Sequence, residues 1–350
     1  YWLLHTVQGT LGRTVCRRLC ESSDNSKKLQ GRHRMTIKRI ADSGLMIMVI
    51  YILIFAMYGA VQPSALSAYS IQGLFNNSLP LMLAAAGATF VILQGGFDLS
   101  VAGTISLVNA IVAVLQFDGA LGAIGMLAIA LAAGILVGAI NGFVVAYLKV
   151  QAIAATLATM IICQGVALLI LRAPGGYVSD FMTYELTGSM FGIPVAIIIA
   201  TLVALLWFVF RRTNAGRNLL AVGQDAKAAE LSGINVARTQ FFSFIWAGAL
   251  YALAAYFLAA LTSTGSPSAG EPFLLLTFAA VALGGTAFGG GRGSVTASLL
   301  GAATLVLMQK LLFSVGVSSF YTGMIQGMIM VLAVLFSGAV QFVVDRRNII

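Results

Sequence analysis

The sequence predicts an all-α integral membrane protein with about ten transmembrane helices and both termini in the cytoplasm. The composition is 59% hydrophobic and only 9% charged, which leaves too few polar residues to cover a soluble globule of 350 residues. Long apolar stretches run through the chain, and nearly every Lys and Arg flanks them on one side. The stretches do not alternate polar and apolar residues, so they predict helices and not the strands of a membrane barrel.

Each apolar stretch has roughly the 20 residues that a helix needs to cross a bilayer. The first follows a basic flank, the third and eighth are short, and a long polar segment separates the sixth from the seventh. A transmembrane domain over residues 41–345 accommodates all of them. The predicted spans are 44–60, 74–93, 101–116, 121–148, 152–171, 190–210, 241–261, 273–288, 295–314 and 321–344.

The basic residues orient these spans. With the N-terminus in the cytoplasm, every one of the 20 Lys and Arg except Arg172 and Lys310 lies in a cytoplasmic segment. Such a bias is the positive-inside pattern of a plasma-membrane protein. The net charge of +9 therefore indicates contact with anionic membrane lipid at the inner face, and not a nucleic-acid partner.

Residues 1–40 differ from the rest of the chain and predict a basic, disordered cytoplasmic tail. They show neither an amphipathic period nor a cleavable signal pattern, and Met35 stands just before the first span. We expect Met35 to be the natural start and residues 1–34 to be dispensable. Cys16 and Cys20, with His5 and His33 nearby, do not have a usual zinc spacing, so we expect no metal site.

No arrangement of residues for bond chemistry is present in the spans. Both His residues lie in the tail, which excludes a His-based catalytic site within the bundle. The glycine-rich segment 289–294 lacks the Gly-Lys-Ser/Thr ending of a phosphate-binding loop and predicts a tight turn. We expect no catalytic residue and no cofactor on this chain, so any ATP, with its Mg²⁺, is bound by a partner.

The loop 211–240 is the only long polar segment after the tail. Its first residues suggest a basic, turn-rich exit from the sixth span, and Gly223 to Asp225 suggests a helix start with Asp225 as N-cap. Residues 226–232 favour a helix of about two turns, and Gly233 is a suitable stop. Such a short helix is not stable alone, so it needs a groove on its own bundle or on a partner.

Several separated motifs resemble one transporter family. Residues 228–234 (Ala-Ala-Glu-Leu-Ser-Gly-Ile), residues 95–100 (Gly-Gly-Phe-Asp-Leu-Ser), residues 151–157 after Asn141-Gly142, and residues 279–295 match its motifs in order. By these motifs the chain resembles the ribose-type permease subunits of bacterial ABC sugar importers, the family of ribose, xylose, arabinose, galactoside and autoinducer-2 permeases. The resemblance covers roughly residues 40–345.

That resemblance implies a multi-pass permease subunit in the bacterial inner membrane, importing a monosaccharide or a similar polyhydroxylated solute. Its partners would be a cytoplasmic ABC ATPase, a second permease copy or homologue, and a periplasmic sugar-binding protein. The short inner helix would be the coupling helix that contacts the ATPase, through Gly223, Asp225, Ala228, Ala229, Glu230, Leu231, Ser232 and Gly233. The alternative is a secondary transporter driven by an ion gradient, which would need titratable groups near the midplane.

Polar residues in the spans are candidates for a translocation pathway. Asp98 is costly at a span junction, so it either forms a helix cap or a structural turn, or contacts solute or coupling machinery. For each amide or hydroxyl, hydrogen bonding between helices is the alternative. Glycines that interrupt short spans in both halves also indicate a pathway. The candidates are Gly95, Gly96, Asp98, Ser100, Asn109, Asn141, Gln151, Thr156, Thr159, Gln164, Gly284, Gly285, Gln309 and Gln326.

Overall fold

The computed structural model of the protein describes residues 44–115 and 117–318, with a few single positions between 321 and 331. The predicted tail, Met35, Gln326 and most of the predicted tenth span lie outside these residues. The described helices are α2 (Leu45–Val61), α3 (Ala68–Leu93), α4 (Val101–Val114), α5 (Gly119–Ala146), α6 (Ala152–Ile170), α7 (Asp180–Thr187), α8 (Val195–Phe210), α9 (Asn214–Gln224), α10 (Ala226–Leu231), α11 (Val236–Thr262), α12 (Glu271–Leu283) and α13 (Val295–Ser314). A 3-10 turn, η1 (Pro63–Leu66), follows α2, and β1 (Ser189–Met190) pairs with β2 (Ile193–Pro194) in a small antiparallel hairpin.

The predicted all-α membrane class is confirmed by these helices. Each of the first nine predicted spans corresponds to one helix. By length and composition, α3, α5, α6, α11 and α13 can each cross a membrane, and α8 with α9 would add a sixth span bent by 80°. The apolar helices α2, α4 and α12 are shorter. The number of crossings and the side of the termini stay predictions.

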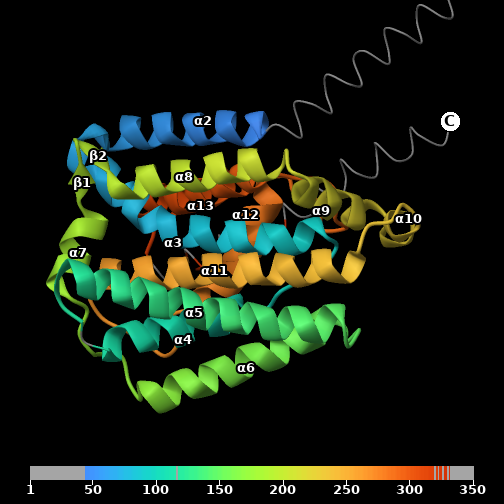
Figure 1. Cartoon of the computed structure of the whole chain (residues 1–350). Helices are drawn as coiled ribbons and strands as arrows, with labels where there is room; N and C mark the ends of the chain where they lie inside the picture. Colours follow the sequence, from blue (N-terminus) through green and yellow to red (C-terminus); the bar gives the residue numbers. More distant parts are fainter. Residues whose placement is uncertain are drawn as a thin grey trace, which may run out of the picture.

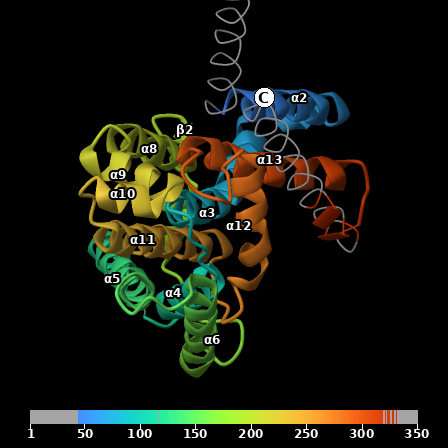
Figure 2. The same cartoon turned by 90° about the vertical axis from the view of Figure 1, so that its right-hand side faces the viewer.

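The helices form a layered bundle around α3 and α11. Figure 1 shows these two in the middle, with α2, α8 and α13 on one side and α4, α5 and α6 on the other. Most of α3 is buried because α8, α11, α12 and α13 surround it. Figure 2 shows the same bundle from the end at which α9 and α10 lie.

Small residues let α5 and α11 pack closely. A Cβ atom placed on Gly134 would collide with the Gly248 carbonyl oxygen, and one on Gly138 would collide with the Phe244 carbonyl oxygen. Inside a membrane, where lipid is as apolar as the side chains, close backbone packing is a principal source of helix association. These glycines therefore define one of the tightest helix contacts of the bundle.

Two apolar helices are short, and two helices end in the same way. With 14 and 13 residues, α4 and α12 are only about 20 Å long, shorter than the roughly 30 Å hydrocarbon layer. The helices α3 and α12 end alike, with Gly95 and Gly285 at φ 87° and 76°. In each, the next residue donates back to a valine carbonyl, Gly96 N–H to Val91 and Thr286 N–H to Val281. This is the Schellman ending, which uses glycine for its left-handed residue.

The connecting segments sort to opposite ends of the bundle. At one end, Gly291 N–H donates to the Leu93 carbonyl (2.8 Å), and α9 packs against both segments. At the other end, Gly175 pairs with Gly265, and the Gln72 side chain donates to the Thr187 carbonyl (2.7 Å). The predicted cytoplasmic segments thus meet one another, as do the predicted outer segments. This agrees with a chain that crosses the membrane alternately.

The structure corrects the interpretation of residues 211–224. The expected turn is confined to residues 211–213, and the rest of the segment is α9, whose N-cap Thr213 accepts a hydrogen bond from Gly216 N–H (3.3 Å). Burial of Leu219 and Val222 stabilises the helix despite the turn-forming residues at its start. Gly223 consequently lies in the last turn of α9 and does not begin the next helix. The sequence also did not predict α7 or the β1–β2 hairpin.

Candidate functional site

Asp98 forms a buried turn in front of α4. Its side chain is 2% exposed, and Oδ1 accepts hydrogen bonds from the Ser100 backbone N–H (2.9 Å) and the Ser100 hydroxyl (2.6 Å). Neither side chain caps α4, so the expected helix cap is wrong and the alternative, a structural turn, is what the structure contains. The two hydrogen bonds from Ser100 offset part of the free-energy cost of burying the Asp98 carboxylate.

The Asp98 turn is connected by hydrogen bonds to two other helices and lies close to a third. Asn141 on α5 donates from Nδ2 to the Ser100 hydroxyl (2.9 Å) and accepts from the Thr159 hydroxyl of α6 (2.6 Å). The Thr156 hydroxyl accepts from Leu99 N–H (3.0 Å). On α11, the Tyr251 hydroxyl approaches Asp98 without complete hydrogen-bond geometry. These buried groups therefore connect helices to one another in this conformation.

The other pathway candidates are placed differently. Asn109 Oδ1 accepts from Ser266 N–H (2.7 Å), while its Nδ2 has no partner among the described residues. Gln151 is exposed at the start of α6 and Gln164 is half-buried. Gly95, Gly96, Gly284 and Gly285 lie at the helix endings described above. Among the candidates that the structure describes, hydrogen bonds thus bring together Asp98, Ser100, Asn141, Thr156 and Thr159.

A junction of glycines connects the Asp98 loop to the polar loop 211–240. A Cβ on Gly223 would collide with the Leu93 carbonyl oxygen, and one on Gly290 would lie 2.8 Å from both the Gly223 oxygen and the Gly95 nitrogen. Three segments far apart in the sequence therefore meet through backbone contacts, and the Gln224 side chain adds a hydrogen bond from its Nε2 to the Gly291 carbonyl oxygen (3.5 Å). The end of α9 is therefore in direct contact with the segment that precedes Asp98.

The helix α10 projects beyond this junction at the end of the bundle (Figure 1). Asp225 caps it as predicted, because its Oδ1 accepts from the backbone N–H groups of Lys227 (2.9 Å) and Ala228 (3.1 Å). Gly233, at φ 83°, ends it as predicted, since Gly233 N–H donates to Glu230 and Ile234 N–H to Ala229. Hydrogen bonds thus define both ends of this six-residue helix, which packs against α9 and α11.

The outer face of α10 is open. Leu231 is 91% exposed, and Glu230 and Ser232 are also exposed. Ala229 is only 5% exposed, so it faces inward and is unsuited to direct contact with a partner. A cavity of about 490 Å³ lies beside the helix, with Lys149, Lys227 and Gln240 among its lining residues.

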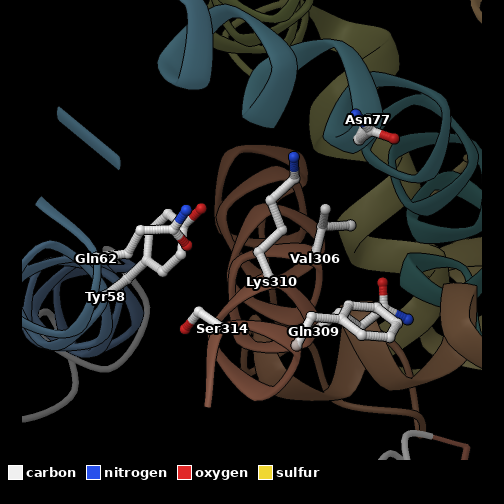
Figure 3. Close-up of a pocket in the computed structure, with 8 residues that line it drawn as sticks. Tyr58, Gln62, Asn77, Val306, Gln309, Lys310 and Ser314 are labelled. Carbon is white, nitrogen blue, oxygen red and sulfur yellow. The ribbon is translucent and has the colours of Figure 1, made fainter. Parts of the chain in front are cut away.

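A second cavity, of about 500 Å³, opens toward the opposite end, between α2, α3 and α13 (Figure 3). It contains Gln309, a predicted pathway residue, together with groups that the sequence analysis missed. The signal that could have found it was Lys310, a cation within an otherwise apolar stretch. The lining residues are Tyr58, Gln62, Asn77, Val306, Gln309, Lys310, Phe313 and Ser314.

Helices apolar and long enough to cross a membrane, a buried polar turn and an exposed capped helix are features expected of a membrane-embedded transport subunit. The described residues contain no group of His, Cys, Asp and Glu that could hold a metal ion. The chain belongs to the family described as branched-chain amino acid transport system / permease component, whose model matches residues 70–334. It is therefore a permease component and not an enzyme.

Curated relatives are similar over most of the chain. The ribose import permease protein of Haemophilus influenzae is 33% identical over 290 residues, covering 81% of this chain and 90% of that protein. The ribose import permease protein of Bacillus subtilis is 35% identical, covering 83% and 90%. The D-allose transport system permease protein of Escherichia coli is 31% identical, covering 81% and 87%. The predicted resemblance to sugar permeases is confirmed. No solved structure matches the chain.

Proposed function

We propose that this chain is the transmembrane permease subunit of a bacterial ABC importer, and that it translocates a monosaccharide or a similar small polyhydroxylated solute across the inner membrane. Relatives named for ribose import and for D-allose transport support the substrate class. The buried network of amides and hydroxyls around Asp98 contains one carboxylate and no cation. A bundle interior of this kind suits a neutral solute better than an ion.

The observation that carries the proposal is the geometry of α10. The helix is capped at both ends, exposes Leu231, and is connected through Gly223 to the segment before Asp98. In this arrangement, a conformational change of a bound ATPase would displace α10, and the contact at Gly223 would extend that displacement into the bundle. The ATPase subunit would bind ATP with Mg²⁺, and this chain would bind neither.

The remaining partners follow from the same proposal. A second permease copy or a homologue would complete the translocation pathway, and a periplasmic sugar-binding protein would deliver the solute. The cytoplasmic side would be the end that carries α10. Lys149, Arg211, Arg217, Lys227 and Arg292 flank that end, where anionic lipid attracts basic residues.

Crosslinking tests the assignment of α10. In a cysteine-free background, Leu231→Cys should form a disulfide with a cysteine placed in the cleft of the co-expressed ATPase, because Leu231 is the most exposed apolar side chain of α10. The control is Leu66→Cys, which is 60% exposed on η1 at the other end of the bundle and should not crosslink. Equal crosslinking of the two, or none at Leu231→Cys, would contradict the proposed docking.

A further inference from the structure

Lys310 is an unusual residue for its position. It lies on α13, one of the helices long and apolar enough to cross a membrane, and its side chain is half-buried. No ion pair or hydrogen bond of its ammonium group is formed within the described residues. A cation at such a place is costly unless it is solvated or paired, and intramembrane ionisable groups usually serve a function.

Within the part of the chain that the structure describes, the surroundings of Lys310 are polar and contain no negative charge. Figure 3 shows its ammonium group between the side chains of Tyr58 from α2 and Gln62 just after α2 and the side chain of Asn77 from α3. Gln309 comes from the same helix as Lys310. None of the residues that line the cavity is acidic. The cavity therefore offers one cation, three amides and a phenol. None of its lining residues carries a negative charge that would neutralise the cation.

The volume of about 500 Å³ lies within the range of small-molecule sites. Gln62 Nε2 already donates to the Ser64 hydroxyl (3.1 Å), and Asn77 Nδ2 donates to the Gly73 carbonyl (2.6 Å). Both amide oxygens stay available as acceptors for ligand hydroxyls. Ser314 is held by its bond to Leu311 (2.7 Å), so it contributes little.

We propose that this cavity binds a polyhydroxylated anion, with Lys310 contacting a carboxylate or phosphate while Gln62, Asn77 and Gln309 contact hydroxyl groups. An ammonium–carboxylate hydrogen bond is stronger than a neutral one and supplies the missing counter-charge. Two sources have this chemistry: a soluble sugar acid or sugar phosphate, and the phosphoglycerol headgroup of an anionic phospholipid. The site does not depend on the proposed import of a neutral solute.

Binding of a matched pair of ligands tests the site. Gluconate and sorbitol share one carbon chain and differ by a carboxylate in place of a hydroxymethyl group. With the full chain purified in complex with its ATPase, we expect gluconate to bind at least about tenfold tighter than sorbitol, as a charge-assisted hydrogen bond implies. Lys310→Met should remove this preference, and Lys310→Arg should keep it. Because the readout is a ratio of two affinities, partial misfolding of a variant does not change it.

A second experiment tests whether a lipid headgroup occupies the cavity. In nanodiscs, phosphatidylglycerol should raise the Tm of the wild type above its value in phosphatidylcholine, and Lys310→Met should abolish that difference. The control is Arg172→Met, which removes an exposed cation outside the cavity and should change neither result. A gluconate preference identifies the solute and a phosphatidylglycerol effect identifies the headgroup. The proposal is overturned if Lys310→Met behaves as the wild type in both arms, or if Arg172→Met shows the same loss.

Discussion

Replacing Gly134 with leucine is expected to abolish the folded bundle. A Cβ on Gly134 would overlap the Gly248 carbonyl oxygen and lie 2.6 Å from the Ala252 Cβ, so α5 and α11 would have to separate. Overpacking of a tight contact costs about 1–3 kcal/mol or more, and here the obstacle is backbone that cannot rotate away. Gly134→Leu should therefore yield little monodisperse protein in size-exclusion chromatography after membrane extraction.

The matched control is Gly125→Leu on the same helix. Gly125 is exposed, and a Cβ there meets no atom within 4 Å. Leucine has the higher helix propensity, so this variant should be at least as stable as the wild type. If the two variants gave equal yields and equal Tm values, the close packing of α5 on α11 would be wrong.

The second large effect is expected at Gly233. This residue holds the end of α10 at φ 83°, a conformation that a β-branched residue strongly disfavours. Gly233→Val should cost about 1–2 kcal/mol in that conformation and displace Leu231 from the surface that the ATPase would contact. Membrane insertion should be normal, whereas solute-stimulated ATP hydrolysis in the reconstituted complex should fall by about tenfold.

A change of backbone preference can be separated from a change of size at this position. A Cβ on Gly233 would meet no atom within 4 Å, so bulk alone should not matter. Asparagine tolerates positive φ better than other residues, and Gly233→Asn should retain most of the coupling. Uncoupling by Gly233→Asn as severe as that by Gly233→Val would show that the left-handed helix ending is not the cause.

Unbroken apolar runs with polar boundaries were predictable from the sequence. The predicted span 295–314 coincides with α13, because Ser294 and Gly316 bound a predominantly apolar stretch. The short helix α10 was predictable for a local reason: Asp225 and Gly233 supply its two ends. In contrast, α9 begins with turn-forming residues and is stabilised by burial of Leu219 and Val222, which depends on tertiary contacts.

The candidate site was predictable only in part. Asp98, Ser100 and Asn141 were chosen one by one as polar residues in apolar surroundings, and the fold connects them. Nothing in the linear sequence brings Gln62 of the segment after α2 near Lys310 of α13, since their proximity depends on how these helices pack. Helix packing of this kind is set by long-range contacts that periodicity does not report.

Energy coupling in sealed vesicles tests the central claim most directly. The permease is reconstituted with its ATPase and its binding protein, ATP is supplied to the ATPase side, and ionophores collapse the proton and sodium gradients. If the chain is an ABC permease driven through α10, uptake of labelled monosaccharide continues with ATP and stops when ATP is replaced by a nonhydrolysable analogue. Uptake that stops on adding the ionophores, with ATP still present, would contradict this account and favour a secondary transporter.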